Sequence, residues 1–264
     1  MQLIPTFAAV KSLDQIIAPI TDELAQFEAF FQQTLRADTE PMDSIMRYAS
    51  ETKGKRIRPI LVLLSAKLFG EVNSQTLRAA TFVEMVHSAT LIHDDVVDDA
   101  DERRNRASLK AKFGNLSAVL AGDYLLAKAV LLLSHPEDQA ILQEMLSTTA
   151  AMSEGELMQN QNNSNYIDII TRKTAMLMRS CCVAGALSAK AAAKQVQEIT
   201  DFGLNFGILF QLRDDILDKE HTEQAQALLP TYQSKVLQAL KTLPHNETAI
   251  ALQELTLFCA ERME

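Results

Sequence analysis

Apolar residues recur at helical spacing along almost the whole chain. In segments such as "IRPILVLLSAKLFG", at 57–70, they fall three and four positions apart, as on one face of a helix. No segment shows the alternation of apolar and polar residues that would indicate a half-buried strand. The pattern therefore predicts long helices over 57–70, 74–100, 115–134, 137–159, 166–190 and 193–218.

The ends and the composition of these segments refine the prediction. Gly70 suits the position after a helix C-terminus, and Ser74 suits the cap of the next helix. The segment 115–134 is apolar nearly all round, which is typical of a central buried helix. With 8 glycines and 7 prolines among 264 residues, and no linker, we expect one domain over 1–264. The expected fold class is all-α, a helical bundle around a central apolar cavity.

Charge and composition exclude several classes of protein. A net charge of −9 disfavours nucleic-acid binding, which needs a cationic surface. No run of about 18 uncharged apolar residues predicts a transmembrane helix, and the N-terminal "MQLIPTFAAVKSLDQ" lacks the basic region of a signal peptide. Cys181 and Cys182 are adjacent in an apolar run, so we interpret them as buried, reduced thiols rather than redox or metal-binding groups. We therefore expect a cytoplasmic protein.

A cluster of aspartates follows the apolar part of the helix predicted at 74–100. Asp94, Asp95 and Asp98 form a D-D-x-x-D pattern, in which Asp94 and Asp98 share a helix face. Two carboxylates placed there repel each other, and a hard divalent cation such as Mg²⁺ would relieve the repulsion. For this motif alone, a solvated acidic helix end is an equally good interpretation.

The same pattern recurs near the end of the helix predicted at 193–218, in Asp214, Asp215 and Asp218. Two copies of this pattern are much harder than one to explain as exposed aspartates without a function. If the helices face each other, their ends form a carboxylate-lined mouth above an apolar interior. This geometry suits a ligand with a diphosphate head and a hydrocarbon tail. The spacing and the missing glycine exclude an EF-hand loop.

Cationic side chains flank both clusters. Each of them alone is better interpreted as a surface charge, but together they could bind a second, metal-free diphosphate. His87 belongs to the set because it lies two helical turns before Asp94, on roughly the same face. The other members are Lys55, Arg56, Arg58, Arg103, Arg104 and Lys173, the last with Thr174 beside it.

These residues resemble the trans-isoprenyl diphosphate synthase (polyprenyl synthetase) family. The similarity covers most of the chain and keeps the family's order: "GKRIRP", "HSATLIHDDVVDDADERR", "GDYLLA", "GEL", "KTA" and "FQLRDDILD". The resemblance implies an all-α fold of the isoprenoid synthase type and a homodimer. It also implies a Mg²⁺-dependent condensation of isopentenyl diphosphate with an allylic diphosphate, which releases pyrophosphate.

The resemblance also implies roles for individual residues. Isopentenyl diphosphate would be bound by Lys55, Arg58, His87 and Arg104. The allylic diphosphate would be bound by Arg103, Lys173, Thr174 and Gln211. Asp94, Asp98 and Asp214 would lead the Mg²⁺ coordination, with Asp95, Asp215 and Asp218 in support, and with Lys173 they would be the catalytic residues. The main alternative is a non-catalytic partner subunit of the same fold, although such subunits typically lose an aspartate motif.

The chain departs from the family pattern in several places. Lys53 and Asn105 stand where glycines are usual. The segments after Gln159 and Asp218 are short and fall where the family has loops that resemble lids. Either these segments are deleted, or mobile segments are missing from a continuously numbered chain. We favour the second explanation because mobile lids are rarely ordered.

Product length is expected to depend on the residues that precede the first aspartate motif. In the family, a bulky aromatic residue at this place stops growth at short products. Here Ala89 and Thr90 are small. Phe82 is the next large side chain, about 18 Å from Asp94 at roughly 1.5 Å per residue. We therefore expect a long-chain product, with octaprenyl diphosphate as the best single choice and a short-chain (farnesyl or geranylgeranyl) synthase as the alternative. A close approach of a neighbouring helix would also explain the small Ala89.

Overall fold

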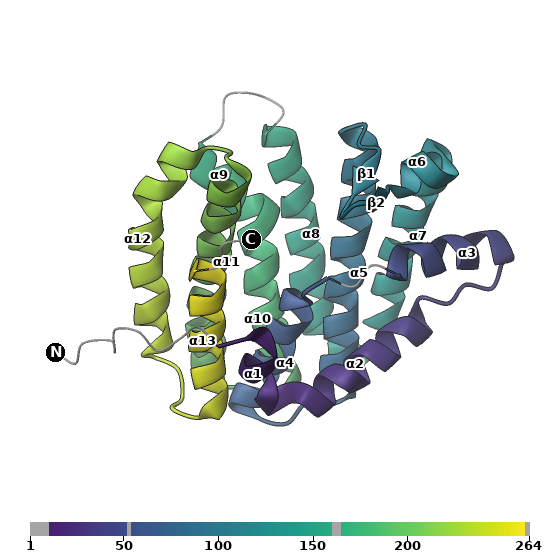
Figure 1. The fold of residues 1–264 in the computed structure, drawn as a ribbon. Coiled ribbons are helices and arrows are strands. Elements are labelled where there is room, and N and C mark those ends of the chain that lie inside the picture. Colours follow the sequence, from purple (N-terminus) through teal and green to yellow (C-terminus); the bar gives the residue numbers. More distant parts are fainter. Residues whose placement is uncertain (1–10, 52–53, 160–164, 262–264) are drawn as a thin grey trace.

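The computed structural model describes residues 11–51, 54–159 and 165–261, and these form an almost entirely helical bundle (Figure 1). The helices before the first aspartate motif are α1 (Leu13–Ile16), η1 (Ala18–Ile20), α2 (Thr21–Thr34), α3 (Glu40–Ser50), α4 (Ile57–Phe69) and α5 (Ser74–Val97). A two-stranded hairpin, β1 (Glu102–Arg103) and β2 (Arg106–Ala107), follows. The rest comprises α6 (Leu109–Phe113), α7 (Asn115–Leu132), η2 (Pro136–Asp138), α8 (Gln139–Gln159), α9 (Tyr166–Ile170), the π-helical η3 (Thr171–Ala175), α10 (Met176–Ser188), α11 (Ala193–Asp218), α12 (Thr222–Leu240) and α13 (Glu247–Glu261).

Helices α4 and α10 lie at the centre of the bundle. Both are buried over most of their residues, as their nearly uninterrupted apolar and small side chains require. They pack closely against each other, because a Cβ atom on Gly185 would lie only 2.3 Å from the backbone oxygen of Val62. Helices α5 and α11 pack against this central pair and carry the two aspartate motifs. The prediction of an all-α fold is therefore confirmed.

The prediction of a central position for 115–134 is wrong. Helix α7 packs its small residues against α5, but Leu116, Leu120 and Leu131 are 75%, 51% and 66% exposed. Within the described residues, α7 also has the length and apolar content of a membrane-spanning helix, with 28% of that window buried. This window contains Asp123 and Lys128, so the expectation that no uncharged apolar run of about 18 residues occurs stands. The apolar character of α7 reflects one side buried on α5 and another side left uncovered.

The predicted helices are close to those observed, with differences at two helix ends and in one internal turn. Asn73, and not Ser74, caps α5, since its side chain accepts the backbone N–H of Thr76 at 3.1 Å. The helix predicted at 74–100 ends at Val97, and the chain then turns into the β1–β2 hairpin. The helix predicted at 166–190 contains the π turn 171–175, which hydrophobic spacing alone did not indicate.

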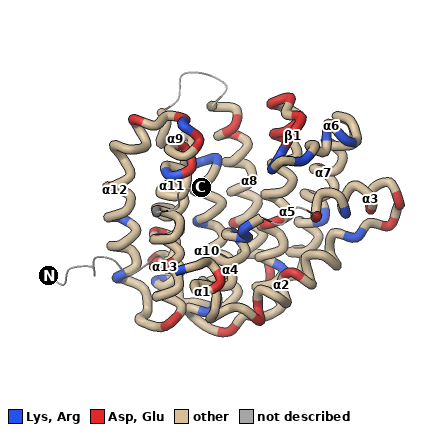
Figure 2. Tube along the Cα trace, in the orientation of Figure 1, with Lys and Arg blue, Asp and Glu red and all other residues tan. Residues whose placement is uncertain are grey.

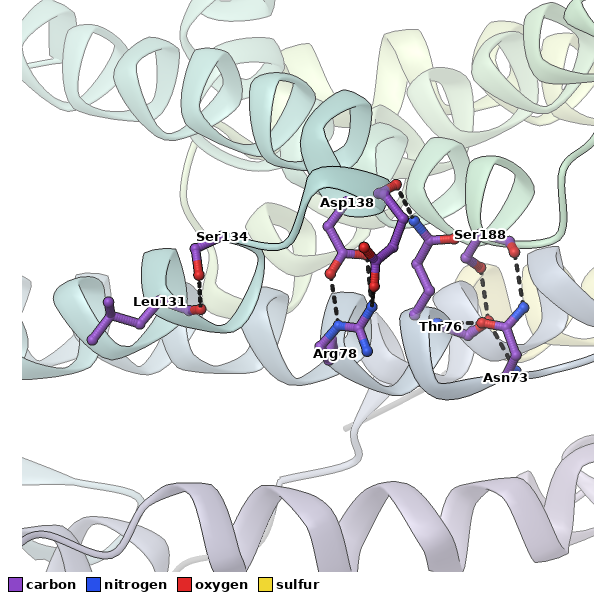
Figure 3. Close-up of polar contacts among 9 residues, drawn as sticks. Asn73, Thr76, Arg78, Leu131, Ser134, Asp138 and Ser188 are labelled. Atoms are coloured by element: carbon purple, nitrogen blue, oxygen red, sulfur yellow. Dashed lines mark hydrogen bonds and ion pairs between the residues drawn. The ribbon is translucent and has the colours of Figure 1, made fainter.

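The end of the bundle far from the aspartates is tied together by polar contacts (Figure 3). The Arg78 guanidinium donates to both carboxylate oxygens of the fully buried Asp138, at 2.7 and 3.0 Å. Thr76 shares a hydroxyl hydrogen bond of 2.7 Å with Ser188, and Asn73 donates to the Ser188 carbonyl at 2.9 Å. These contacts join the start of α5 to the end of α10 and to η2.

Candidate active site

The site lies at the opposite end, where α5, α8, α9 and α11 bring their polar ends together (Figure 1). Figure 2 shows acidic and basic segments gathered there, around α9, the end of α8 and β1. The elements that reach this end come from distant parts of the sequence. Their long apolar runs are buried in the core, so each helix presents its polar end at the rim of the bundle.

The end of α5 forms an acidic pole. The pKa of Asp94 is raised to about 6, first by burial of the carboxyl and then by the nearby Glu156 and Asp98 carboxylates. Lys173 and Arg103 oppose this shift without cancelling it. Asp98 is exposed. The free protein thus contains a carboxyl group that would be stabilised in its ionised form by further positive charge.

Glu156 on α8 is a component of this pole that sequence reasoning missed. It forms an ion pair of 2.6 Å with Lys173, whose ammonium also donates to Gln159 Oε1 at 2.6 Å. The segment "GEL", which contains Glu156, belongs to the family resemblance, but the sequence assigned no role to its side chains. The signal available was the spacing of Glu156 and Gln159, three residues apart and therefore on one helix face.

The π turn η3 presents Lys173 and Thr174. A π turn holds one residue more than an α turn and often marks functional sites. Its backbone is in close contact with α8, because a Cβ atom on Gly155 would lie 2.7 Å from Arg172 Cβ. Thr174 then donates its hydroxyl hydrogen to Gln211 Oε1 on α11 at 2.7 Å. The turn thereby connects α8 with α11 at the level of the aspartates.

The second aspartate motif is arranged unequally. Asp215 is only 6% exposed and accepts hydrogen bonds from the Tyr166 hydroxyl and from Gln211 Nε2, the latter at 2.7 Å. Asp214 is half-buried and Asp218 is exposed. Across residues 11–51, 54–159 and 165–261, no three His, Cys, Asp or Glu side chains converge closely enough to bind a metal ion by themselves. The carboxylates of the described residues at this end are therefore separate and not gathered around one point.

A basic pole lies beside the acidic one, at the start of α4. Arg58 Nη1 and His87 Nε2 are 3.0 Å apart, and Arg58 Nε is a buried donor without a hydrogen-bond partner. The pKa of His87 is lowered well below its ordinary value, first by burial and then by Arg58 and Arg104. The positive charges of Arg58 and Arg104 both act on His87, and this arrangement suits an anionic ligand.

Arg103 and Arg104 point to different partners. Arg103 forms an ion pair of 2.6 Å with the buried Asp95. The Arg104 guanidinium instead lies over Gly54, where an added Cβ atom would be 2.9 Å from Nη1. Both arginines and His87 line a cavity of about 120 Å³ between α2, α3, α5 and the hairpin. Lys55 and Arg58 do not line this cavity, and Lys55 is exposed.

Arg56 acts as a structural anchor, a function that sequence reasoning did not assign. It has a left-handed backbone with φ 55° and forms ion pairs with Glu28, at 2.7 Å, and with Glu84. These contacts connect α2 and α5 to the segment that carries Lys55 and Arg58. Lys53, the departure noted before this segment, lies outside the described residues.

The connection after Asp218 corrects an expectation. The chain passes from α11 to α12 through residues 219–221 alone, and the Lys219 N–H caps α11 by bonding the Asp215 carbonyl. Lys219 and His221 both adopt left-handed backbones, with φ 62° and 44°. The preference for a missing mobile segment is wrong at this point, because a tight turn closes the connection. The segment after Gln159 falls on 160–164, outside the described residues.

The residues expected to control product length lie on two faces of α5. His93 faces α7, since a Cβ atom on Gly122 would lie 2.1 Å from His93 Nε2. Ala89, one turn before His93, is fully buried on that same face, and Phe82 follows two turns further down. Thr90 is on the face of Asp94 and donates its hydroxyl hydrogen to the His87 carbonyl at 2.9 Å. The rotation of α5, which sequence alone could not fix, turns the face that carries Ala89 and Phe82 toward α7.

Comparison with known proteins adds three findings. The sequence model of the polyprenyl synthetase family matches residues 39–227. Octaprenyl diphosphate synthase from Haemophilus influenzae is 34% identical over 240 residues, which cover 88% of this chain and 72% of the relative. Component 2 of heptaprenyl diphosphate synthase from Geobacillus stearothermophilus is 35% identical over 233 residues, with 85% and 72% covered.

A solved structure is also similar over nearly the whole chain. It is a polyprenyl synthase from Caulobacter crescentus, complexed with calcium and isoprenyl diphosphate. The two folds superpose with a TM-score of 0.90 at 25% identity, over 98% of this chain and 100% of the other.

Proposed function

Since the chain belongs to the polyprenyl synthetase family, we propose that it condenses isopentenyl diphosphate with an allylic diphosphate to build a long-chain all-trans polyprenyl diphosphate. The family relationship makes it a prenyltransferase enzyme. Octaprenyl diphosphate is our best single choice of product. The small Ala89 and the octaprenyl synthase relative support this choice over a farnesyl or geranylgeranyl product.

The observation that carries the proposal is the pair of oppositely charged poles at one end of the bundle. Burial and like-charge neighbours displace the pKa of Asp94 upward and that of His87 downward. Each shift favours the neutral form, so each pole would be stabilised by a ligand of opposite charge. A diphosphate with divalent cations suits the acidic pole, and a metal-free diphosphate suits the basic pole.

The donor set of the acidic pole fits Mg²⁺. This ion binds oxygen ligands, and it typically takes a few carboxylates together with substrate phosphates and water. Asp94, Asp98 and Asp214 would lead the coordination, supported by Asp95, Asp215 and Asp218. When bound, the ions would stabilise negative charge that develops on the departing pyrophosphate. The absence of a closed cage among the described carboxylates agrees with a site that the substrate completes.

The side chains of the protein then bind and orient the two substrates. Arg103, Lys173, Thr174 and Gln211 would bind the allylic diphosphate, whose bond between carbon and oxygen breaks as pyrophosphate leaves. Lys55, Arg58, His87 and Arg104 would bind isopentenyl diphosphate, whose double bond attacks the allylic carbon. The proton lost afterwards passes to the released pyrophosphate, so the reaction needs no side-chain base. Fixed cations around the leaving group are the chief electrostatic contribution.

We also propose a homodimer in the cytoplasm. The support is a set of large apolar side chains left exposed in the monomer, the leucines of α7 together with Leu146 of α8 at 44% exposure, because a subunit interface would bury such side chains. The alternative, a non-catalytic partner subunit, is disfavoured because both aspartate motifs are intact.

The experiment is incubation of the purified protein with isopentenyl diphosphate, an allylic primer and Mg²⁺, followed by sizing of the products. We expect Asp94→Ala and Asp214→Ala to lower turnover by about a hundredfold or more while the protein stays folded. Asp201→Ala is the matched control, because Asp201 is an exposed aspartate elsewhere on α11. Near-normal rates in both aspartate variants would refute the metal site, and an inactive wild-type protein would favour the partner-subunit alternative.

A further inference from the structure

A chain of hydrogen bonds runs beneath the second aspartate motif. The Tyr166 hydroxyl donates to Asp215 Oδ2, and Gln211 Nε2 donates to Asp215 Oδ1 at 2.7 Å. Gln211 Oε1 in turn accepts the Thr174 hydroxyl hydrogen at 2.7 Å. Three elements, α9, α11 and the π turn η3, are joined through one buried carboxylate.

Both oxygens of Asp215 accept hydrogen bonds from neutral donors inside the protein. The side chain is 6% exposed, whereas Asp214 is half-buried and Asp218 is exposed. A buried carboxylate needs such donors, because an unsatisfied charged group is costly in a low-dielectric surrounding. Asp215 therefore faces the protein interior, and its contacts fix the rotation of the last turns of α11.

The tight turn after α11 supports Tyr166 from the other side. The His221 ring lies 5.0 Å from the Tyr166 ring, measured between centroids. Only residues 219–221 separate α11 from α12. His221 therefore lies next to Tyr166 at the start of α9. Burial and the bond to Asp215 raise the pKa of Tyr166, so its hydroxyl keeps its proton and remains a donor.

We propose that Tyr166 is a positioning residue for the reaction, which acts through Asp215 to hold the carboxylates of Asp214 and Asp218 toward the allylic diphosphate. The support that Asp215 gives to the Mg²⁺ coordination is then indirect: it anchors the motif from inside the protein and does not itself bind the metal ion. This inference rests on the proposed function. It assigns a role to a residue of α9 that belongs to neither aspartate motif.

The test is Tyr166→Phe, which removes one hydroxyl and keeps the ring. A hydrogen bond to a charged group contributes about 1.5–3 kcal/mol, which corresponds to roughly a tenfold to hundredfold change. We expect the half-saturating Mg²⁺ concentration and the KM for the allylic substrate to rise about tenfold, with the KM for isopentenyl diphosphate unchanged. Tyr232→Phe is the control, because Tyr232 is a buried tyrosine on α12, away from these contacts.

The route through Asp215 is tested by a double-mutant cycle. If Tyr166 acts through Asp215, the double variant Tyr166→Phe/Asp215→Asn should be no worse than the worse single variant. Additive losses, an unchanged Mg²⁺ dependence, or equal effects on both substrates would overturn the inference. Should Tyr166→Phe fail to fold, the cycle is repeated with His221→Ala, which removes the ring contact and should raise the same two constants. Activity of the wild-type protein under the same conditions separates this outcome from failure of the proposed function.

Discussion

At the scale of single residues, Asp94 and His87 illustrate how the free site is balanced. They lie two turns apart on α5, and each is displaced toward its neutral form by burial and by like charges. Under the proposed function, a charged ligand would supply the opposite charge that each group lacks in the free protein.

The shifted pKa of Asp94 predicts a pH dependence of stability in the metal-free protein. The folded pKa, about 6, exceeds the ordinary value of 3.8, so the folded state binds more protons between these pH values. Ionised Asp94 therefore costs stability above pH 6, and this cost disappears as the pH falls. We expect Asp94→Asn to raise the Tm at pH 7 but not at acidic pH. Added Mg²⁺ should shrink the difference at pH 7, and an equal difference at both pH values would contradict the assignment.

Arg103 and Arg104 should affect different substrates. Arg104 lies with His87 and Arg58 at the basic pole, whereas Arg103 is paired with Asp95 beside the first motif. We expect Arg104→Ala to raise the KM for isopentenyl diphosphate about tenfold or more, and Arg103→Ala to raise the KM for the allylic substrate similarly. Steady-state kinetics with each substrate varied in turn gives the answer. Equal effects of each variant on both substrates would refute the division.

Sequence patterns predicted the candidate site residues whose own spacing suggests a chemical role. Asp94, Asp98 and Lys173 belong to short motifs whose charge pattern demands an explanation. Glu156 and Tyr166 have no such pattern, because their importance comes from a neighbour on another helix. That information exists only after α8, α9 and α11 have packed.

At the scale of elements, apolar periodicity predicted the long helices but not their layers. The sequence of α7 resembles that of a buried core helix because it is apolar nearly all round, yet its buried residues are limited to four small residues and Leu125. Hydrophobicity alone does not distinguish a helix surface that is buried in the monomer from one that a second subunit would cover. The π turn was missed for a related reason, since one extra residue hardly disturbs an apolar pattern.

The position of Ala89 predicts control of product length by α5. Ala89 and Phe82 share the face that packs on α7, with Phe82 nearer the far end of the bundle. We expect Ala89→Phe to shorten the product sharply and to leave the first condensation intact, because the new ring would occupy the space below the aspartates that the proposed product tail needs. Phe82→Ala should not shorten the product. Chromatographic sizing of the products checks both, and a wild-type protein that stops at farnesyl or geranylgeranyl diphosphate would defeat the prediction.

At the scale of the whole molecule, the uncovered surface of α7 predicts self-association. Burial of a charge at an apolar interface is costly, so Leu120→Glu should convert the dimer to a monomer. Ile250→Glu on α13 is the matched control, because Ile250 is a similarly exposed apolar residue on another helix. Light scattering at micromolar concentration should give a dimer mass for the wild type and the control. A monomer mass for the wild type would end this proposal.

The polar contacts at the far end of the bundle have a consequence for turnover. At that end Arg78 is hydrogen-bonded to Asp138, and Thr76 is hydrogen-bonded to Ser188. An apolar tail that separated these pairs would form no hydrogen bonds in return. Under the proposed function, a finished product would withdraw its tail past the aspartates, and each methylene transferred to water would cost about 0.8 kcal/mol. Desorption should slow steeply with each added isoprene unit. The rate of the enzyme on long chains would then be governed by whatever apolar phase, bilayer or micelle, receives the tail as it emerges.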